Sequence, residues 1–273
     1  MKTRATGETF ERLCNILDNN SKVYYSRFGD GDFNIMNGKR ELMHEWSPEL
    51  QVELRESFVI DDPLYLKGAM VNYPLEEGMT WGVFAPATNN TEIENWLLTN
   101  QKVDPETIFD SHIMFHYMSV FKQDLMIEFL DKYIRPKKKM LINSFSPDDH
   151  VHAPECHRSF DHSKSTRVQE FERLELLIGK IDHFVEVPFT DAYYKMDEWW
   201  PEIEENIDGV ELCIPAAGMA GRVVQKRLWN LNKDLHSIDL GAVLDAVAQR
   251  STRTWIDVVG DKVDNLLINN RDK

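Results

Sequence analysis

Two carboxylates lie two residues apart in the segment Ser-Arg-Phe-Gly-Asp-Gly-Asp-Phe, which spans 26–33. A glycine precedes each of them, Asp30 and Asp32, and glycine allows a tight backbone turn after a strand. Two carboxylates that converge repel each other unless a cation lies between them. Mg²⁺ and Mn²⁺ accept one or two carboxylates together with phosphate oxygens, so the segment predicts a divalent metal site on Asp30 and Asp32.

The same segment also has a plain structural interpretation, because Asp and Gly gather in ordinary β-turns. Arg27 lies upstream of the pair and either binds a phosphate or holds one of the aspartates in place. The metal site and the simple turn both remain open at this point.

A second element suited to an anion is the small-residue loop Pro-Ala-Ala-Gly at 215–218, between an expected strand and an expected helix. Backbone N–H groups and the positive end of the helix dipole attract an anion there. Small residues are equally suited to close packing of strand and helix. Arg222 lies one turn into the helix, and Asp239 lies at the strand end where open α/β sheets bind ligands. Asp191 and Asp239 each suit a ligand contact or a local cap.

Imidazoles and a thiol gather in the least regular part of the chain, at His150, His152, Cys156, His157 and His162. These are zinc ligands, but their spacing fits no standard finger or ribbon. In a loop they could instead contact an acceptor or act as a general base, or have neither role. The surrounding stretch, 144–166, is long for a structureless connection and is predicted to be an active-site lid. His150, His152 and His157 are therefore candidate acceptor contacts.

Alternating apolar patterns predict the elements that position these residues. We expect helices over 10–17, 91–99, 115–134, 168–178, 192–206 and 219–231, and strands over 23–28, 64–70, 139–143, 183–187, 210–214 and 235–240. Such alternation predicts an α/β fold with a Rossmann-like, mostly parallel sheet flanked by helices. We expect one domain over 1–273, with a weakly patterned tail at 251–273.

The charge balance restricts the possible partners of this 273-residue chain, which carries 46 acidic and 31 basic side chains and a net charge of -15. It counts against a broad nucleic-acid surface and against binding to an anionic membrane. The three cysteines are widely spaced, which predicts no disulfide framework and a reducing compartment. No apolar run approaches the roughly 18 residues of a membrane span, and the N-terminus lacks an apolar signal region. We therefore expect a soluble protein of a bacterial or phage-infected cytoplasm.

The segment at 26–33 resembles the R-F-G-D-G-E-F signature of the GT-D glycosyltransferases, a family first described as a domain of unknown function. Segments at 62–68, 186–193 and 213–241 are similar to further parts of that family and extend the resemblance over about 8–245. In the family, the acidic motif binds a divalent metal and the diphosphate of a nucleotide sugar. Two departures are Asp32, which replaces a glutamate, and Ala242, where many members have a histidine.

The resemblance implies a glycosyltransferase that moves a sugar from a nucleoside-diphosphate sugar to an acceptor hydroxyl with the help of Mn²⁺ or Mg²⁺. We expect three catalytic residues, of which the first two bind the metal: Asp30, Asp32 and Asp239. The expected donor-binding residues are Arg27, Gly29, Gly31, Ala217, Gly218, Arg222 and Asp191. A non-catalytic nucleotide- or carbohydrate-binding module and a metal-dependent phosphohydrolase are the alternatives.

Two acceptors are compatible with the sequence: a saccharide, or a hydroxymethylated base in bacteriophage DNA. Net charge favours the saccharide, but a base flipped out of a duplex needs only a local cationic groove. The residues that could form such a groove are Arg158, Lys164, Arg167 and Lys137–Lys139. The sugar, the nucleotide and the oligomeric state are not predicted.

Overall fold

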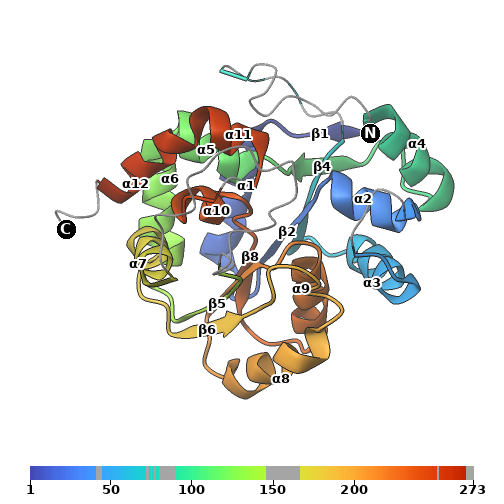
Figure 1. The fold of residues 1–273 in the computed structure, drawn as a ribbon. Helices are drawn as coiled ribbons and strands as arrows, with labels where there is room; N and C mark the ends of the chain where they lie inside the picture. The colour runs from blue at the N-terminus through green and yellow to red at the C-terminus, as the bar shows by residue number, and fades with distance from the viewer. Residues whose placement is uncertain are drawn as a thin grey trace.

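The computed structural model describes residues 1–40, 45–71, 74, 76, 78, 79, 90–145, 167–250 and 252–268. Within these ranges eight strands form a single sheet with parallel pairing throughout, in the order β1-β4-β3-β2-β8-β7-β5-β6 (Figure 1). The strands are β1 (Lys2–Thr3), β2 (Tyr24–Phe28), β3 (Tyr65–Ala69), β4 (Ile108–Ser111), β5 (Lys139–Asn143), β6 (His183–Glu186), β7 (Leu212–Ala216) and β8 (His236–Ile238). The predicted α/β class with a parallel sheet is confirmed.

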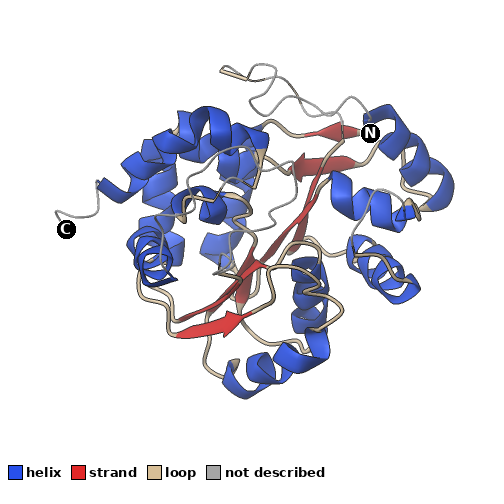
Figure 2. Cartoon of the chain, viewed as in Figure 1, coloured by secondary structure: helices blue, strands red, loops and turns tan. Residues whose placement is uncertain are grey.

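Helices cover both faces of the sheet (Figures 1 and 2). A hydrophobic core lies on each face. One face is covered by α1 (Thr6–Asn19), α5 (Met114–Phe121), α6 (Gln123–Phe129), the π-helical turn η2 (Leu130–Ile134), α7 (Arg167–Ile178), α10 (Val243–Val247), α11 (Thr254–Val259), the 3-10 turn η5 (Gly260–Asp264) and α12 (Asn265–Ile268). The other face is covered by α2 (Asp30–Met36), α3 (Pro48–Phe58), α4 (Asn90–Asn100), α8 (Met196–Asn206) and α9 (Ala220–Asn230).

The chain leaves the neighbouring strands β2 and β8 toward opposite faces of the sheet. After β2 it enters α2, whose Phe33 and Met36 are buried in one core. After β8 it enters α10, whose Val243 and Leu244 are buried in the other core. In open α/β sheets, ligands bind beyond the carboxyl ends of strands at the place where the connections diverge in this way. The fold therefore directs a binding site to the ends of β2 and β8.

Most predicted strands lie within two residues of the observed ones, and β5 has the predicted bounds. The helix predicted to begin at 192 begins at Met196 instead, after a turn. The sequence analysis did not identify β1, β4 or α3. The start of α3 does carry a local signal, because the Ser47 hydroxyl accepts a hydrogen bond from Leu50 N at 3.0 Å and proline follows at the first helical position.

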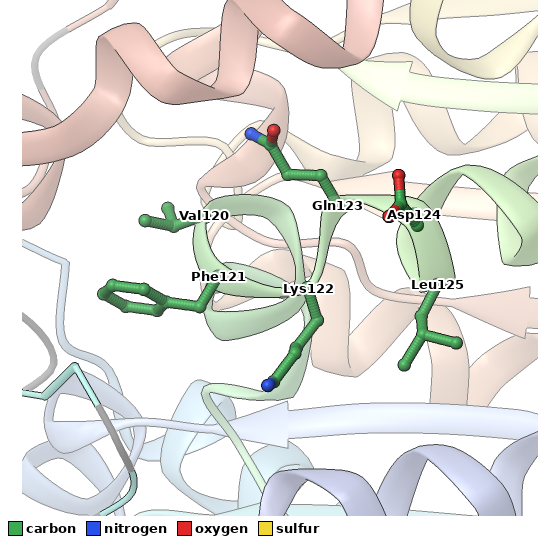
Figure 3. Close-up of a pocket in the computed structure, with 6 residues that line it drawn as sticks. All are labelled: Val120, Phe121, Lys122, Gln123, Asp124 and Leu125. Atoms are coloured by element: carbon green, nitrogen blue, oxygen red, sulfur yellow. The ribbon is translucent and has the colours of Figure 1, made fainter.

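The single helix predicted over 115–134 is wrong. The backbone breaks at Lys122, which has φ -135° and ψ 52°, and the chain continues as α6 and then η2. The break rotates the following turn, and Leu125 is exposed. Figure 3 shows the break, where Val120–Leu125 line a cavity of about 350 Å³ that contains none of the predicted site residues. Leu231, which directly follows the end of α9 at Asn230, is also exposed.

The described part of the tail, 252–268, is helical and packs against the core. Trp255, Ile256, Val263 and Leu266 are buried there with side chains of α5, α6 and α7. Apolar burial, which the weak sequence pattern did not reveal, therefore holds this segment in place. No helix in the ranges that the structure describes is both long enough and apolar enough to cross a bilayer.

A buried ion pair joins the start of this segment to α7. Arg250 and Glu170 are both almost fully buried and form a salt bridge, and Arg250 also lies 3.8 Å from Asp245. We expect Glu170→Gln to lower the free energy of unfolding by about 3 kcal/mol, because it leaves a buried guanidinium without its full counter-charge. Urea unfolding measures this loss. Glu172→Gln, at an exposed position of the same helix, is the control and should change stability by less than about 0.5 kcal/mol.

Candidate functional site

The acidic segment begins a helix rather than forming the expected turn. Gly29 precedes α2, and its N–H donates a hydrogen bond of 2.9 Å to Asp32 Oδ2. Asp30 and Asp32 both lie in the first helical turn, where negative charge is favourable. Side chains two residues apart on a helix do not face each other, and here Asp30 is exposed while Asp32 is buried. The two carboxylates therefore do not converge within this helical turn as expected.

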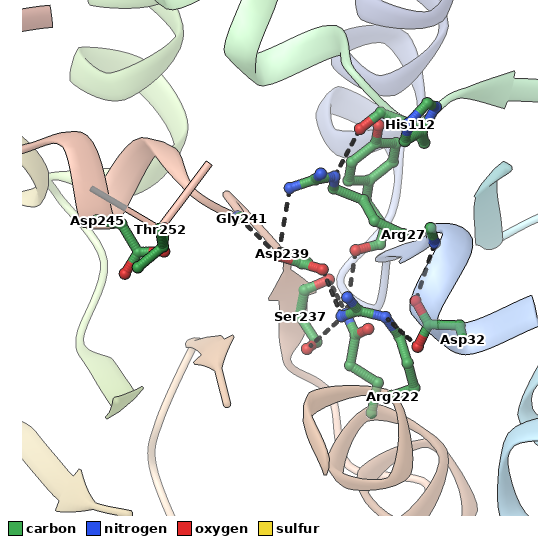
Figure 4. Close-up of polar contacts among 12 residues, drawn as sticks. Arg27, Asp32, His112, Arg222, Ser237, Asp239, Gly241, Asp245 and Thr252 are labelled. Atoms are coloured by element: carbon green, nitrogen blue, oxygen red, sulfur yellow. Dashed lines mark hydrogen bonds and ion pairs between the residues drawn. The ribbon is translucent and has the colours of Figure 1, made fainter. Parts of the chain in front are cut away.

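Arg222 of α9 links the buried aspartate to the end of β8. Its Nη1 forms a salt bridge with Asp239 Oδ2, and its Nε lies 3.7 Å from Asp32 Oδ1. Figure 4 shows the Arg222 guanidinium between the two carboxylates. Both aspartates are buried, and a buried charge requires a partner. The arrangement therefore fixes α2, α9 and β8 relative to one another.

Arg27 of β2 adds a second guanidinium to the same cluster. Its Nε donates to the carbonyl of His112 at 2.6 Å, and its Nη1 lies 3.9 Å from Asp239 Oδ1. That same oxygen accepts a 2.7 Å hydrogen bond from Gly241 N. Both oxygens of Asp239 are therefore engaged. We call Arg27, Asp32, Arg222 and Asp239 the ion network.

Burial and pairing act in opposite directions on the pKa values of the ion network. Burial raises the pKa of Asp32, against the opposing effects of Arg222 and of the Gly29 N–H. Burial also works to lower the pKa of Arg222, but the carboxylates of Asp239 and Asp32 outweigh it and raise that pKa. Arg222 therefore stays cationic and offsets part of the effect of burial on Asp32.

A pocket of about 770 Å³ opens beside the ion network, at the ends of β5, β6 and β7. It is lined by Glu45, Ser144, Val187–Ala192, Ala216–Met219 and Arg253. Its position and size are those of a small-molecule site. The pocket contains three of the predicted donor-binding residues, namely Asp191, Ala217 and Gly218.

Two carboxylates line one side of this pocket. Asp191 has a φ of 60°, a left-handed conformation that is uncommon outside glycine and that recurs at functional sites. Burial raises the pKa of Glu45, with Asp191 adding to the effect, whereas the backbone N–H groups of 191–193 act to lower it. Glu45 therefore lies close to the Asp191 loop.

The structure brings most of the predicted site residues together, in two adjoining groups. Arg27, Asp32, Arg222 and Asp239 form the ion network, and Asp191, Ala217 and Gly218 line the pocket. Gly29 and Gly31 lie at the start of α2, next to the exposed Asp30. Three acceptor candidates, His150, His152 and His157, lie outside the described residues, as do Cys156, His162 and the lid after Phe145. Those predictions stay predictions.

Sequence reasoning missed Glu45 and Arg253, which belong to segments without a motif. Only the tertiary fold carries them to the pocket, so no local signal could have identified them.

No group of three or more His, Cys, Asp or Glu side chains suited to a metal occurs among the described residues. A divalent ion at Asp30 and Asp32 would therefore need further ligands from a substrate or from water.

Part of the basic strip proposed for a DNA acceptor lies away from the pocket. Lys137–Lys139 lie at the amino end of β5, whereas the pocket lies beyond its carboxyl end. Lys139 is buried, and its Nζ donates to the carbonyls of Arg135 and Lys180. Arg167 forms a salt bridge with Glu186. Residues 158 and 164 fall in the stretch that the structure does not describe.

Known structures share this fold. No protein-family model matches the chain, and no curated protein matches its sequence. A structure described as a new glycosyltransferase of the domain of unknown function 1792 from Streptococcus sanguinis has a TM-score of 0.56 and 15% identity, covering 90% of this chain and 83% of its own. A selenomethionine-substituted domain of unknown function 1792 has a TM-score of 0.57 and 14% identity, covering 90% and 80%.

A third structure is described as a highly conserved domain of unknown function 1792 with a distinct glycosyltransferase fold. It has a TM-score of 0.53 and 15% identity, and the match covers 88% of this chain and 78% of that one. At such low identity the likeness is one of fold. The present chain therefore has the fold of this glycosyltransferase domain.

Gly241 is the point of closest approach in the ion network. Its φ is 60°, and a Cβ added there would lie 1.3 Å from Arg27 Nη1 and 3.0 Å from His116 Nε2. We expect Gly241→Ala to cost about 3 kcal/mol, because it combines backbone strain with a clash that displaces Arg27. Gly218→Ala is the matched control. Gly218 has a φ of 54° but open space around it, so it should cost about 1 kcal/mol from strain alone. Guanidinium unfolding measures both losses, and equal losses of unfolding free energy in the two variants would contradict the predicted clash with Arg27.

Proposed function

We propose that this protein is a metal-dependent glycosyltransferase that takes its sugar from a nucleoside-diphosphate sugar. The observation that carries the proposal is the position of the ion network beside a 770 Å³ pocket, at the strand ends where the connections of β2 and β8 diverge. Solved domains with the same fold are described as glycosyltransferases, which supports this reaction class. The fold alone does not specify the donor, so the donor is argued from the residues.

The donor's nucleoside diphosphate is proposed to lie over the loop between β7 and α9. Ala217 and Gly218 line the pocket there and leave room for a ligand to approach the backbone. The N-terminus of the eleven-residue helix α9 follows directly, and its N–H groups favour an anion. Arg27 and Arg222 lie behind this loop as cations of the ion network. Such fixed charges stabilise a leaving diphosphate without reorganising during the reaction.

The acidic residues of α2 suit a hard divalent ion. Asp32 Oδ1 is buried and accepts no hydrogen bond from any residue in the described ranges, and its nearest cation is Arg222 Nε at 3.7 Å. The exposed carboxylate of Asp30 is near enough to raise the pKa of Asp32, although burial is the larger cause. Carboxylate oxygens of this kind, completed by diphosphate oxygens, are what Mg²⁺ and Mn²⁺ prefer. When bound there, the ion would supply positive charge for the departing diphosphate.

The acceptor hydroxyl needs a base, and Asp191 is better placed for this role than Asp239. Both Asp239 oxygens are engaged by Arg222 and Gly241, so Asp239 is proposed to orient the arginines. Asp191 lines the pocket close to Glu45. Its carboxylate would take the hydroxyl proton as the acceptor oxygen bonds to the anomeric carbon. The bond from that carbon to the diphosphate breaks in the same step, and the nucleoside diphosphate leaves with the electron pair.

A saccharide is the acceptor that the pocket favours over DNA. Glu45 and Asp191 place two carboxylates on one wall, which disfavours a phosphate backbone there. Phe189 lines the pocket and is 38% exposed, so it offers an apolar ring face to a neutral ligand. Lys137–Lys139 lie at the amino end of β5, away from the pocket, so they could not contact a duplex bound there.

The function is tested by the products. With a panel of nucleotide sugars and oligosaccharide acceptors, we expect transfer that releases a nucleoside diphosphate and no inorganic phosphate. Asp191→Asn should slow transfer by about 10²–10³-fold, because the amide cannot take the proton. Asparagine tolerates the left-handed backbone, so the loop should keep its shape. Asp197→Asn, at an exposed position of α8, is the control. Full transfer by Asp191→Asn, or transfer only to hydroxymethylated DNA, would contradict the assignment.

The metal is tested by binding. Asp30→Asn should weaken nucleoside diphosphate binding by about tenfold in Mn²⁺ and change it little in EDTA, because only the metal-bound state uses the exposed carboxylate. Isothermal titration calorimetry under both conditions gives the comparison. Glu106→Gln, an exposed acid in the loop before β4, should behave like the wild type in both. Equal affinities of the wild type with and without Mn²⁺ would remove the metal from the proposal.

A further inference from the structure

One arginine lines the pocket beside the ion network. Arg253 lies just before α11, lines the pocket with Ala217 and Gly218, and is exposed. Its Nη1 donates to the neighbouring carbonyl of Thr252 at 2.7 Å. No salt bridge joins Arg253 to a carboxylate within the described part of the chain.

The neighbouring cations do not share this property. Arg222 pairs with Asp239 and Asp32, and Arg27 lies 3.9 Å from Asp239. Burial is the main cause that lowers the pKa of Arg27, and the charge of Arg253 contributes a smaller part of the same shift. Arg253 is thus close enough to act on the ion network while it adds a charge that the network does not compensate. An anionic ligand in the pocket would compensate it.

Side-chain contacts hold the residues on either side of Arg253. Thr252 Oγ1 donates to Asp245 Oδ2 at 2.6 Å, and Asp245 also lies 3.8 Å from the buried Arg250. On the other side, the Trp255 ring stacks on His116 with centroids 5.0 Å apart and an interplanar angle of 27°. Asp245 and Thr252 lie together in Figure 4. The arginine is therefore presented from a fixed segment rather than from a free tail, which lowers the entropic cost of binding.

We propose that Arg253 binds the diphosphate of the donor and that Thr252, through Asp245, positions it. A guanidinium presents parallel N–H donors that match two phosphate oxygens, so the contact is specific as well as electrostatic. The segment after β8, which carries no donor motif, would then complete the pocket. This inference rests on the proposed function, because it assigns a residue to the diphosphate of the same donor.

Inorganic pyrophosphate tests the contact without knowledge of the nucleotide or the sugar. We expect the full chain to bind it and Arg253→Gln to bind it at least tenfold more weakly by calorimetry. Arg253→Lys keeps the charge but loses the paired donors, so it should fall between the two. Lys132→Gln is the matched control, since Lys132 pairs with Asp18 at the far end of α1, and it should bind like the wild type. Wild-type affinity in Arg253→Gln overturns the proposal.

Thr252 provides the test of positioning. Thr252→Val removes the hydroxyl that donates to Asp245 and should weaken pyrophosphate binding several-fold, while Thr252→Ser keeps the hydroxyl and should restore it. Equal weakening in both variants would show that the hydroxyl contact plays no part.

The two levels of the proposal fail in different ways. If Arg253→Gln transfers sugar and binds pyrophosphate normally, the inference is wrong and the glycosyltransferase stands. If the wild type binds pyrophosphate through Arg253 but transfers no sugar from any donor, the anion site stands and the reaction is wrong.

Discussion

The architecture of this site depends on one guanidinium that is shared by two buried carboxylates. Asp32 lies in the first turn of α2 and Asp239 directly after β8, and neither could stay charged in the interior without a cation. Arg222 supplies that charge from α9. The pairing therefore joins the first acidic motif to the last strand, which are separated by two hundred residues of chain. Any ligand that binds at these strand ends meets groups whose positions are already set.

The ion network is the closed part of the site and the pocket is its open part, and the two parts suit different roles. The charges of the network are paired, buried and linked to backbone groups such as Gly29 N and Gly241 N, so they can orient but have little freedom to exchange protons. The pocket carries its charges at the surface, on Asp191 and Arg253. Proton transfer is easier to assign to the open pocket. Both parts can stabilise the charge of a leaving group.

The sequence predicted the sheet well because a parallel strand buried on both faces is a short apolar run, and such runs occur at regular intervals. It also identified Arg27, Asp32, Arg222 and Asp239, which lie at strand or helix ends. It did not predict that Asp30 and Asp32 begin a helix, because glycine and aspartate suit a turn and a helix start equally well. Glu45 and Arg253 were missed for a different reason. Their role comes from where the fold carries them, and no local spacing records that.

The acidity of the chain and the arginine in its pocket act over different distances. At physiological ionic strength a charge is screened beyond roughly 8 Å. The net charge of -15 on the whole molecule therefore governs the repulsion of an approaching anion, whereas a bound anion responds to the charged groups around it. Among the described residues that line the pocket, the charged groups are Arg253, Glu45 and Asp191. A ligand that placed its phosphates at Arg253 and an uncharged part at the two carboxylates would meet favourable charges throughout. A DNA strand, which is anionic along its whole length, would also bring phosphates to the carboxylates.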